Sequence, residues 1–218
     1  MRPNPLILGF DTSAAHCAAA LLSDGQIIAA KHEDMAKGQA ERLMVLCEEV
    51  LAEAGVTWAD LDALGVGIGP GNFTGIRISV AAARGLSMGL GVPAVGINLL
   101  DALALGTDGP VLTCLDARRE TAYVQGFGGA GPAEITHVAL AQIDPAWMPE
   151  GTVCTGSVAT QIEALYSIPR RPSAFAPASA IARLAAQRFG PDTPAPSPLY
   201  MRAPDAAPSK MRGPVMLP

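Results

Sequence analysis

The chain has 218 residues and a mass of 22.3 kDa, which corresponds to one large domain or two small ones. Half of its residues are hydrophobic and only 16% are charged, so most of the chain is unlike the highly charged segments that stay disordered. The formal net charge of −5 argues against nucleic-acid binding by the electrostatics of the molecule as a whole.

The N-terminal residues partly imitate a secretory signal, because Arg2 precedes an apolar run and a group of small residues. Asp11 falls inside the would-be apolar region, so we expect a buried strand of a cytoplasmic protein instead. No run of about 18 uncharged apolar residues occurs, and we therefore expect neither a transmembrane helix nor a membrane partner. The four cysteines are far apart, which favours reduced core residues over disulfides or a zinc site.

The first half of the chain is predicted to alternate between strands and helices. The apolar run at 6–10 predicts a central strand, and Ser23-Asp24-Gly25-Gln26 predicts a hairpin between two further strands. Helical periodicity begins near residue 40 and ends at Gly55, where a glycine is typical of a C-cap. The remaining expected elements are strands at 64–68 and 92–97 and helices at 76–90 and 99–105. This alternation indicates an α/β fold with a partly parallel sheet.

The second half repeats the pattern more weakly. Strands are expected at 111–116, 121–127 and 152–156, with helices near 158–165 and 178–189. Strands that end in Asp11 and Asp116 suggest an internal duplication. From 191 onward proline recurs too often for helix or central strand, so an extended tail is expected, within which 199–202 could dock. We therefore divide the chain into 1–106, a smaller lobe at 107–190, and a Pro-rich tail at 191–218.

Charge is distributed unevenly between the tail region and the rest. Residues from 166 onward carry seven Lys or Arg against two Asp, a balance of +5, which leaves −10 for the rest of the chain. A basic tail of this kind either contacts RNA or complements the acidic body of its own chain, and the second interpretation is favoured.

The loop Gly69-Pro-Gly-Asn-Phe-Thr-Gly75, between a strand and a helix, is the strongest local motif. Its glycines and the following helix N-terminus could hold a phosphate, but the lysine of a P-loop is missing, and a tightly packed turn explains the glycines equally well. Asp11-Thr12-Ser13, at a strand end, could hold a metal-bound water or a nucleotide phosphate, but taken singly it is better explained as a cap or turn. The candidate nucleotide-contacting residues are Asp11, Thr12, Gly71 and Thr74.

Catalytic and metal-binding patterns are missing from the sequence. His16, His32 and His137 are scattered and form no HxxxH or HExxH pair, so no metal ligand is assigned. No local Ser/His/Asp or Cys/His arrangement indicates a catalytic nucleophile, and no catalytic residue is assigned. Arg118-Arg119-Glu120 resembles a solvated turn more than an anion clamp.

Several motifs follow one another along the chain: LGFDTS at 8–13, the hairpin at 23–25, the helix through Glu41 and Leu43, GPGNFTGIR at 69–77, DARR at 116–119 and YMR at 200–202. Taken together in this order, they resemble the TsaB (YeaZ-type) family of bacterial proteins required for threonylcarbamoyladenosine at position 37 of tRNA. The resemblance is strong over 6–127 and weak beyond it. This chain departs from many relatives at Gln39-Ala40, where His-Ser is common, and at Asn72, where Ser is common.

The resemblance implies an actin-like ATPase fold (hexokinase/Hsp70-type, ribonuclease H-like) with two lobes, of which the second is reduced. It implies a non-catalytic accessory subunit that supports a TsaD-type threonylcarbamoyl transferase, which carries the metal, together with a TsaE-type ATPase. Transfer RNA is then contacted only through the complex. The family resemblance assigns no cofactor, although a nucleotide at the subunit interface is left open.

Family dimers, with the TsaD-type partner or with a second copy, are implied to pack through the helices at about 39–54 and 74–90. These helices have more apolar residues than one core face needs, which suggests that part of the surplus faces a partner. The expected interface residues are Leu43, Met44, Leu46, Val50, Ile76, Val80 and Leu86. The alternative function is a self-sufficient ATPase or kinase of the same fold, and a peptidase ranks last because no nucleophile–base pair supports it.

Overall fold

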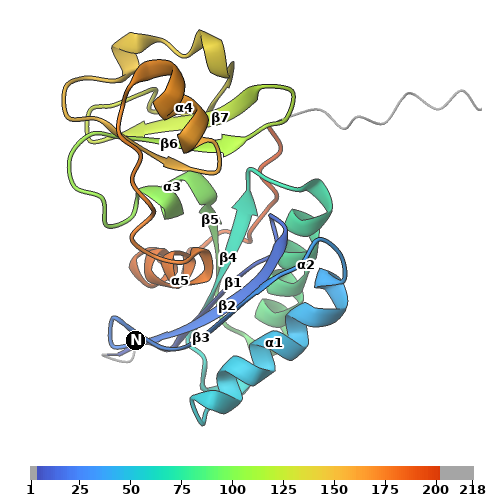
Figure 1. Ribbon diagram of the computed structural model, residues 1–218. Coiled ribbons are helices and arrows are strands. Elements are labelled where there is room, and N and C mark those ends of the chain that lie inside the picture. The colour runs from blue at the N-terminus through green and yellow to red at the C-terminus, as the bar shows by residue number, and fades with distance from the viewer. Residues whose placement is uncertain (1–3, 202–218) are drawn as a thin grey trace, which may run out of the picture.

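The computed structural model describes residues 4–201, which form two α/β lobes, each built on its own sheet, one above the other (Figure 1). The first sheet has the order β3-β2-β1-β4-β5, in which β1, β2 and β3 are antiparallel neighbours and β1, β4 and β5 run parallel. Its strands are β1 (Ile7–Asp11), β2 (His16–Ser23), β3 (Gln26–Asp34), β4 (Ala63–Gly69) and β5 (Ala94–Asn98). The predicted strands and their mixed pairing are confirmed.

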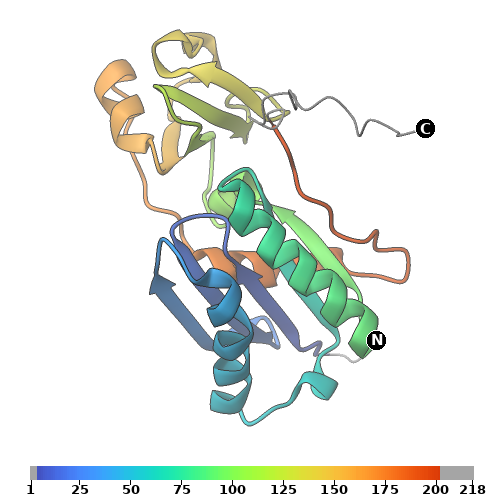
Figure 2. The same ribbon diagram turned by 90° about the vertical axis from the view of Figure 1, so that its right-hand side faces the viewer.

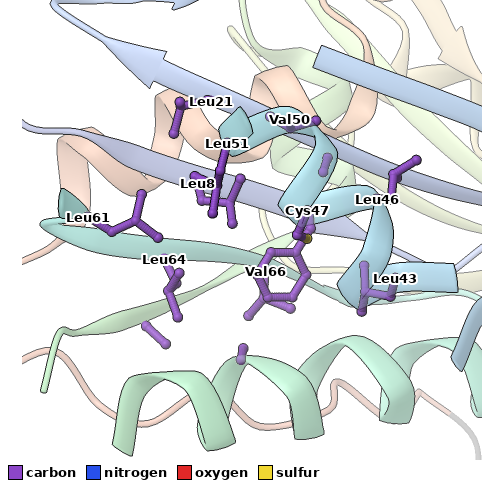
Figure 3. Packing of buried hydrophobic residues seen from close by; sticks show 14 of the residues in the cluster. Leu8, Leu21, Leu43, Leu46, Cys47, Val50, Leu51, Leu61, Leu64 and Val66 are labelled. Carbon is purple, nitrogen blue, oxygen red and sulfur yellow. The ribbon is translucent and has the colours of Figure 1, made fainter. Parts of the chain in front are cut away.

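Helices cover both faces of this sheet. One face carries α1 (Gln39–Glu53) and α2 (Phe73–Leu90), while the other carries α3 (Leu99–Ala104) and α5 (Pro177–Arg188). Because side chains alternate along a strand, Leu8 and Phe10 enter the core under α1 and α2, whereas Ile7 enters the core under α5. Figure 3 shows the first of these cores, in which Leu8 and Val66 of the sheet face the leucines of α1. The central strand β1 is therefore buried on both sides.

The second sheet repeats the beginning of the first in strand order. Its order is β8-β7-β6-β9, with β6–β7 antiparallel and β6–β9 parallel, which matches β3-β2-β1-β4 strand by strand. The elements are β6 (Val111–Asp116), β7 (Thr121–Phe127), β8 (Thr136–Ala139), β9 (Val153–Gly156) and α4 (Ala159–Tyr166). The repeated topology supports the predicted duplication. Strand β8 was not predicted, because it is short and its half-buried residues show no clear alternation.

Helix α5 returns to the first sheet, although the division by sequence placed 177–188 in the second lobe. It lies close against β1 and β4 because both sides of the contact are small. A Cβ at Gly9 would lie 2.6 Å from the Ala178 carbonyl oxygen, and a Cβ at Gly65 would lie 2.8 Å from the Ala185 Cβ. The boundary at 190 therefore separates neither the lobes nor their cores.

Beyond α5 the described chain is extended, as predicted. It runs past the edge of the first sheet to the second lobe (Figure 2), and the Leu199 amide donates to the Ile68 carbonyl at 2.8 Å. Residues 202–218, which include part of the predicted basic tail, lie outside the described residues. Two basic residues that precede them complement their own body: Arg183 donates to the Gly25 carbonyl at 2.6 Å, and Arg188 pairs with Asp101 at 2.9 Å. Within residues 4–201, no helix combines the length and apolar character needed to span a bilayer.

Candidate functional site

Asp11, at the end of β1, is a fully buried carboxylate. Its Oδ2 accepts a hydrogen bond from the Ser13 hydroxyl at 2.8 Å and lies 2.7 Å from His16 Nε2, whereas its Oδ1 has no hydrogen-bond partner among the described residues. The His16 ring also packs against His32, with ring centroids 4.9 Å apart. The turn between β1 and β2 brings His16 to Asp11, and no sequence motif joins the two residues.

The glycines of the 69–75 loop allow two backbones to approach each other. A Cβ at Gly75 would lie 1.8 Å from the Thr12 carbonyl oxygen, and one at Gly71 would lie 2.5 Å from that of Ser13. The Asn72 amide donates to the Ser13 carbonyl at 2.6 Å, and the Thr12 hydroxyl donates to the Gly75 carbonyl at 2.7 Å. These contacts favour the packed-turn interpretation of the loop over a phosphate cradle.

Asn72 caps α2, a role that the sequence analysis did not assign. Its Oδ1 accepts from the amides of Thr74 at 3.0 Å and Gly75 at 3.2 Å. Free amides at a helix N-terminus favour anions, but these two donors are already satisfied by the chain's own side chain. An asparagine directly before a helical pattern is a recognised N-cap signal and could have identified this role. Nucleotide binding by Asp11, Thr12, Gly71 and Thr74 stays a prediction.

Asp116 occupies the place in the second sheet that Asp11 has in the first, but its surroundings differ. The Asp116 side chain is exposed and its Oδ1 accepts from the Arg118 amide at 2.8 Å. After Ala117, the three turn residues Arg118, Arg119 and Glu120 have positive φ angles of 66°, 50° and 56°. A left-handed conformation costs non-glycine residues about 1–2 kcal/mol each, so this turn is held by its hydrogen bonds, which include the Thr121 hydroxyl donating to the Arg118 carbonyl.

Two motifs that are far apart in the sequence meet at the start of α2. Arg77 Nε donates to the Tyr200 hydroxyl at 2.7 Å, and the Arg77 guanidinium lies 3.7 Å from the centre of the Phe73 ring. The Phe73 and Tyr200 rings are 5.2 Å apart. Met201 continues into the second lobe, where it packs against the cluster that contains Ala117. The expected docking of 199–202 is thus confirmed for its described residues, Leu199 to Met201.

Most of the predicted interface residues belong to the chain's own core. Leu43, Leu46, Val50, Ile76 and Val80 are at most 3% exposed, and Figure 3 shows Leu43, Leu46 and Val50 directed into the first core. Met44 and Leu86 are half-buried. Large apolar side chains that remain exposed on these helices are Phe73, at 40%, Val45, at 47%, and Met88, at 84%. Helical periodicity could not separate the core face from the outer face, and the interface itself stays a prediction.

Arg42 of α1 forms ion pairs with two glutamates on this face of the molecule. Arg42 donates to Glu33 on β3 at 2.6 Å and to Glu49 on its own helix at 2.8 Å. These hydrogen bonds from Arg42 lower the pKa of the Glu49 carboxyl to about 2. They also lower the pKa of Glu33 and raise that of Arg42 itself. Arg42 therefore links α1 to β3.

The four cysteines are buried and unpaired, as predicted. Burial raises the pKa of the Cys17 and Cys154 thiols to about 11 and that of Cys114 to about 12, and it also raises the pKa of Cys47. Across residues 4–201, no group of three or more His, Cys, Asp or Glu side chains is arranged to hold a metal ion.

Comparison with known proteins identifies the family of this chain. A family model described as "TsaD: tRNA N6-adenosine threonylcarbamoyltransferase" matches residues 27–140, more than half of the chain. The Escherichia coli tRNA threonylcarbamoyladenosine biosynthesis protein TsaB is 31% identical over 164 residues, which cover 67% of this chain and 71% of that protein. The chain belongs to this family as a TsaB-type protein. It takes part in tRNA threonylcarbamoyladenosine biosynthesis.

The chain is also similar to further proteins and solved structures. An uncharacterized protein of Mycobacterium tuberculosis is 39% identical to this TsaB-type chain over 179 residues, or 79% of each protein. A Pseudomonas aeruginosa structure described as similar to peptidase YEAZ has a TM-score of 0.74 at 25% identity and covers 91% of this chain and 100% of its own. Component A of (R)-2-hydroxyglutaryl-CoA dehydratase from Acidaminococcus fermentans, with a TM-score of 0.55 at 12% identity over 84% of this chain and 98% of its own, shares the fold. The expected actin-like ATPase fold is confirmed.

Proposed function

We propose that this TsaB-type protein is a non-catalytic accessory subunit that binds and supports a TsaD-type threonylcarbamoyl transferase. The observation that carries the non-catalytic role is the closed start of α2. Its first amides donate to Asn72, and the backbone of Thr12 and Ser13 fills the space beside Gly71 and Gly75. A nucleotide phosphate at this position would have to displace the chain's own side chain and backbone.

The partner is proposed to bind the outer surface of α1 and α2. These helices pack side by side over one face of the first sheet (Figure 2), and Val45 and Met88 expose apolar surface on them. Exposed apolar side chains on adjacent helices are typical of the centres of protein–protein interfaces. A second copy of the chain and a TsaE-type ATPase are further proposed partners, and a nucleotide between subunits belongs to the same proposal.

Co-purification with a TsaD-type protein tests the proposed partner. Val45→Glu combined with Met88→Glu should abolish the complex and reduce threonylcarbamoyladenosine in tRNA when the variant replaces the natural chain. Ile28→Glu with Leu165→Glu is the matched control, because these apolar residues are 46% and 54% exposed on other elements, β3 and α4. The proposal fails if wild-type chain forms no complex and its depletion leaves the modified nucleoside unchanged.

The second candidate function, a self-sufficient ATPase or kinase, is favoured by one observation. Asp11 is fully buried at a strand end, and one of its carboxylate oxygens has no hydrogen-bond partner among the described residues. Calorimetry of the isolated chain with Mg-ATP decides between the two functions. Sub-millimolar binding and turnover, both lost in Asp11→Asn, would establish the ATPase and end the non-catalytic proposal.

A further inference from the structure

The exposed aromatic surface of the described chain is concentrated at one place. Phe73 and Tyr200 are the aromatic residues among its exposed large hydrophobic side chains, at 40% and 46% exposure, and their rings are 5.2 Å apart. They come from α2 and from the C-terminal segment, whose positions in the sequence differ by 127 residues (200 − 73). A folded chain usually buries aromatic rings, so two rings that separate segments expose to solvent at one place indicate a ligand-binding surface.

Arginine side chains accompany these rings. The Arg77 guanidinium lies 3.7 Å from the Phe73 ring centre, and its Nε donates to Tyr200, so its planar group is held in one orientation. Arg118 and Arg119 follow Ala117, which belongs to the cluster that Met201 contacts, and they are exposed on the hydrogen-bonded turn between β6 and β7. Other arginines pair with carboxylates, among them Arg42, Arg170 and Arg188. Among residues 4–201, the Arg118 and Arg119 side chains have no such pair.

We propose that this surface, the aromatic platform of Phe73, Arg77 and Tyr200 together with the Arg118–Arg119 turn, binds single-stranded RNA directly. Unpaired bases stack on aromatic rings and guanidinium planes, and arginines at the margin contact phosphates. This differs from the expectation that tRNA is reached only through the complex. It does not depend on the proposed partner, because Met88 is fifteen residues beyond Phe73, about 22 Å along the helix.

Stacking, rather than charge, should supply most of the affinity. Asp116 and Glu120 are exposed on the same turn as Arg118 and Arg119, so the net charge of that turn is close to zero, and the whole chain carries −5. Each neutralised phosphate of a single strand contributes about −0.7 to the salt slope. We therefore expect a shallow salt slope of about −2 or less in magnitude, together with a clear preference for single-stranded over duplex RNA.

Fluorescence anisotropy with the isolated full chain tests this inference. The probes are a labelled single-stranded RNA of about 12 nucleotides, which is within the site sizes of single-strand binding modules, and the same sequence as a duplex. Phe73→Ala and Tyr200→Ala should each weaken single-strand binding about fivefold or more, as expected for loss of one stacked base. Tyr200→Phe keeps the ring and should bind nearly as wild type. Arg118→Gln combined with Arg119→Gln should flatten the salt slope by about 1.4.

The matched controls are Leu165→Ala and Arg171→Gln, which change an exposed apolar and an exposed basic residue of the second lobe. Both should bind as wild type, and circular dichroism must show that every variant is folded. The proposal is overturned if wild-type chain binds no single-stranded RNA, if it prefers the duplex, or if the platform variants bind like the controls. In those cases the platform is a contact for a protein partner. Complex formation with a TsaD-type protein is scored separately, so either result can fail without the other.

Discussion

Gly75 offers a sharp test of the close approach between the turn after β1 and the start of α2. Where a helix position has room for a side chain, replacing glycine by alanine raises the free energy of unfolding by about 1 kcal/mol, because alanine has the higher helix propensity. At Gly75 the added Cβ would lie 1.8 Å from the Thr12 carbonyl oxygen, whose residue also donates its hydroxyl to the Gly75 carbonyl. Overpacking of this kind costs about 1–3 kcal/mol, and more where backbone must move. The steric cost therefore exceeds the propensity gain, and Gly75→Ala should lower the free energy of unfolding by about 1–2 kcal/mol.

The same helix contains a matched control. A Cβ at Gly85 would have no neighbour within 4 Å, and Gly85 is not among the glycines with positive φ. Gly85→Ala should therefore raise the free energy of unfolding by about 0.5–1 kcal/mol, opposite in sign to Gly75→Ala. Urea unfolding followed by circular dichroism measures both, with midpoints compared at unchanged slope. If Gly75→Ala stabilises the protein as much as Gly85→Ala, the packed-turn interpretation of the loop is refuted.

Three further predictions follow from burial and charge. Leu46→Glu should prevent stable folding, because it places a charge in a fully buried site. Val45→Glu, at a 47% exposed site, should leave the thermal unfolding temperature nearly unchanged. Equal unfolding temperatures for the two variants would contradict the placement of α1. The four buried thiols should resist alkylation at pH 8 in the native chain and react in urea, and rapid labelling of the native chain would disprove their burial. The free energy of unfolding should also fall as the pH rises from about 9 toward 11, because the folded chain retains thiol protons that the unfolded chain loses. Since Arg42 lowers the Glu49 pKa from 4.5 to about 2, the stability contributed by this pair should be complete above about pH 4.5 and be lost as the pH falls toward 2, and Glu49→Gln should remove that part of the acid dependence.

Much of the fold could be predicted because its signals are local. The period of the apolar residues distinguishes strands from helices within about ten residues, and β6 and β7 begin and end at the predicted residues. The ordered motifs also indicated the family, which the relatives confirm. Strand β8 escaped prediction because four residues, three of them half-buried and one exposed, carry too short a pattern. Helix α5 was predicted as a helix but assigned to the second lobe, since nothing in its own sequence says which sheet it covers.

The candidate site was less predictable than the fold. Leu43 and Leu46 were expected at an interface, yet they lie in the core, while Val45 between them is exposed. A helical pattern that is apolar on more than one face does not reveal which face the sheet will cover. The loop at 69–75 could be recognised as tight. Whether it surrounds a phosphate or packs against the chain's own backbone depended on the positions of residues 12 and 13, which the sequence does not give.

By itself, the sequence determined the kinds of element, their order and the family, because backbone preferences and side-chain periodicity act between near neighbours. Only the tertiary structure decided that Tyr200 meets Arg77, that His16 reaches Asp11, and that α5 covers the other face of the first sheet. These contacts arise when folded segments pack against one another, and their geometry depends on shapes that no single stretch of the chain contains.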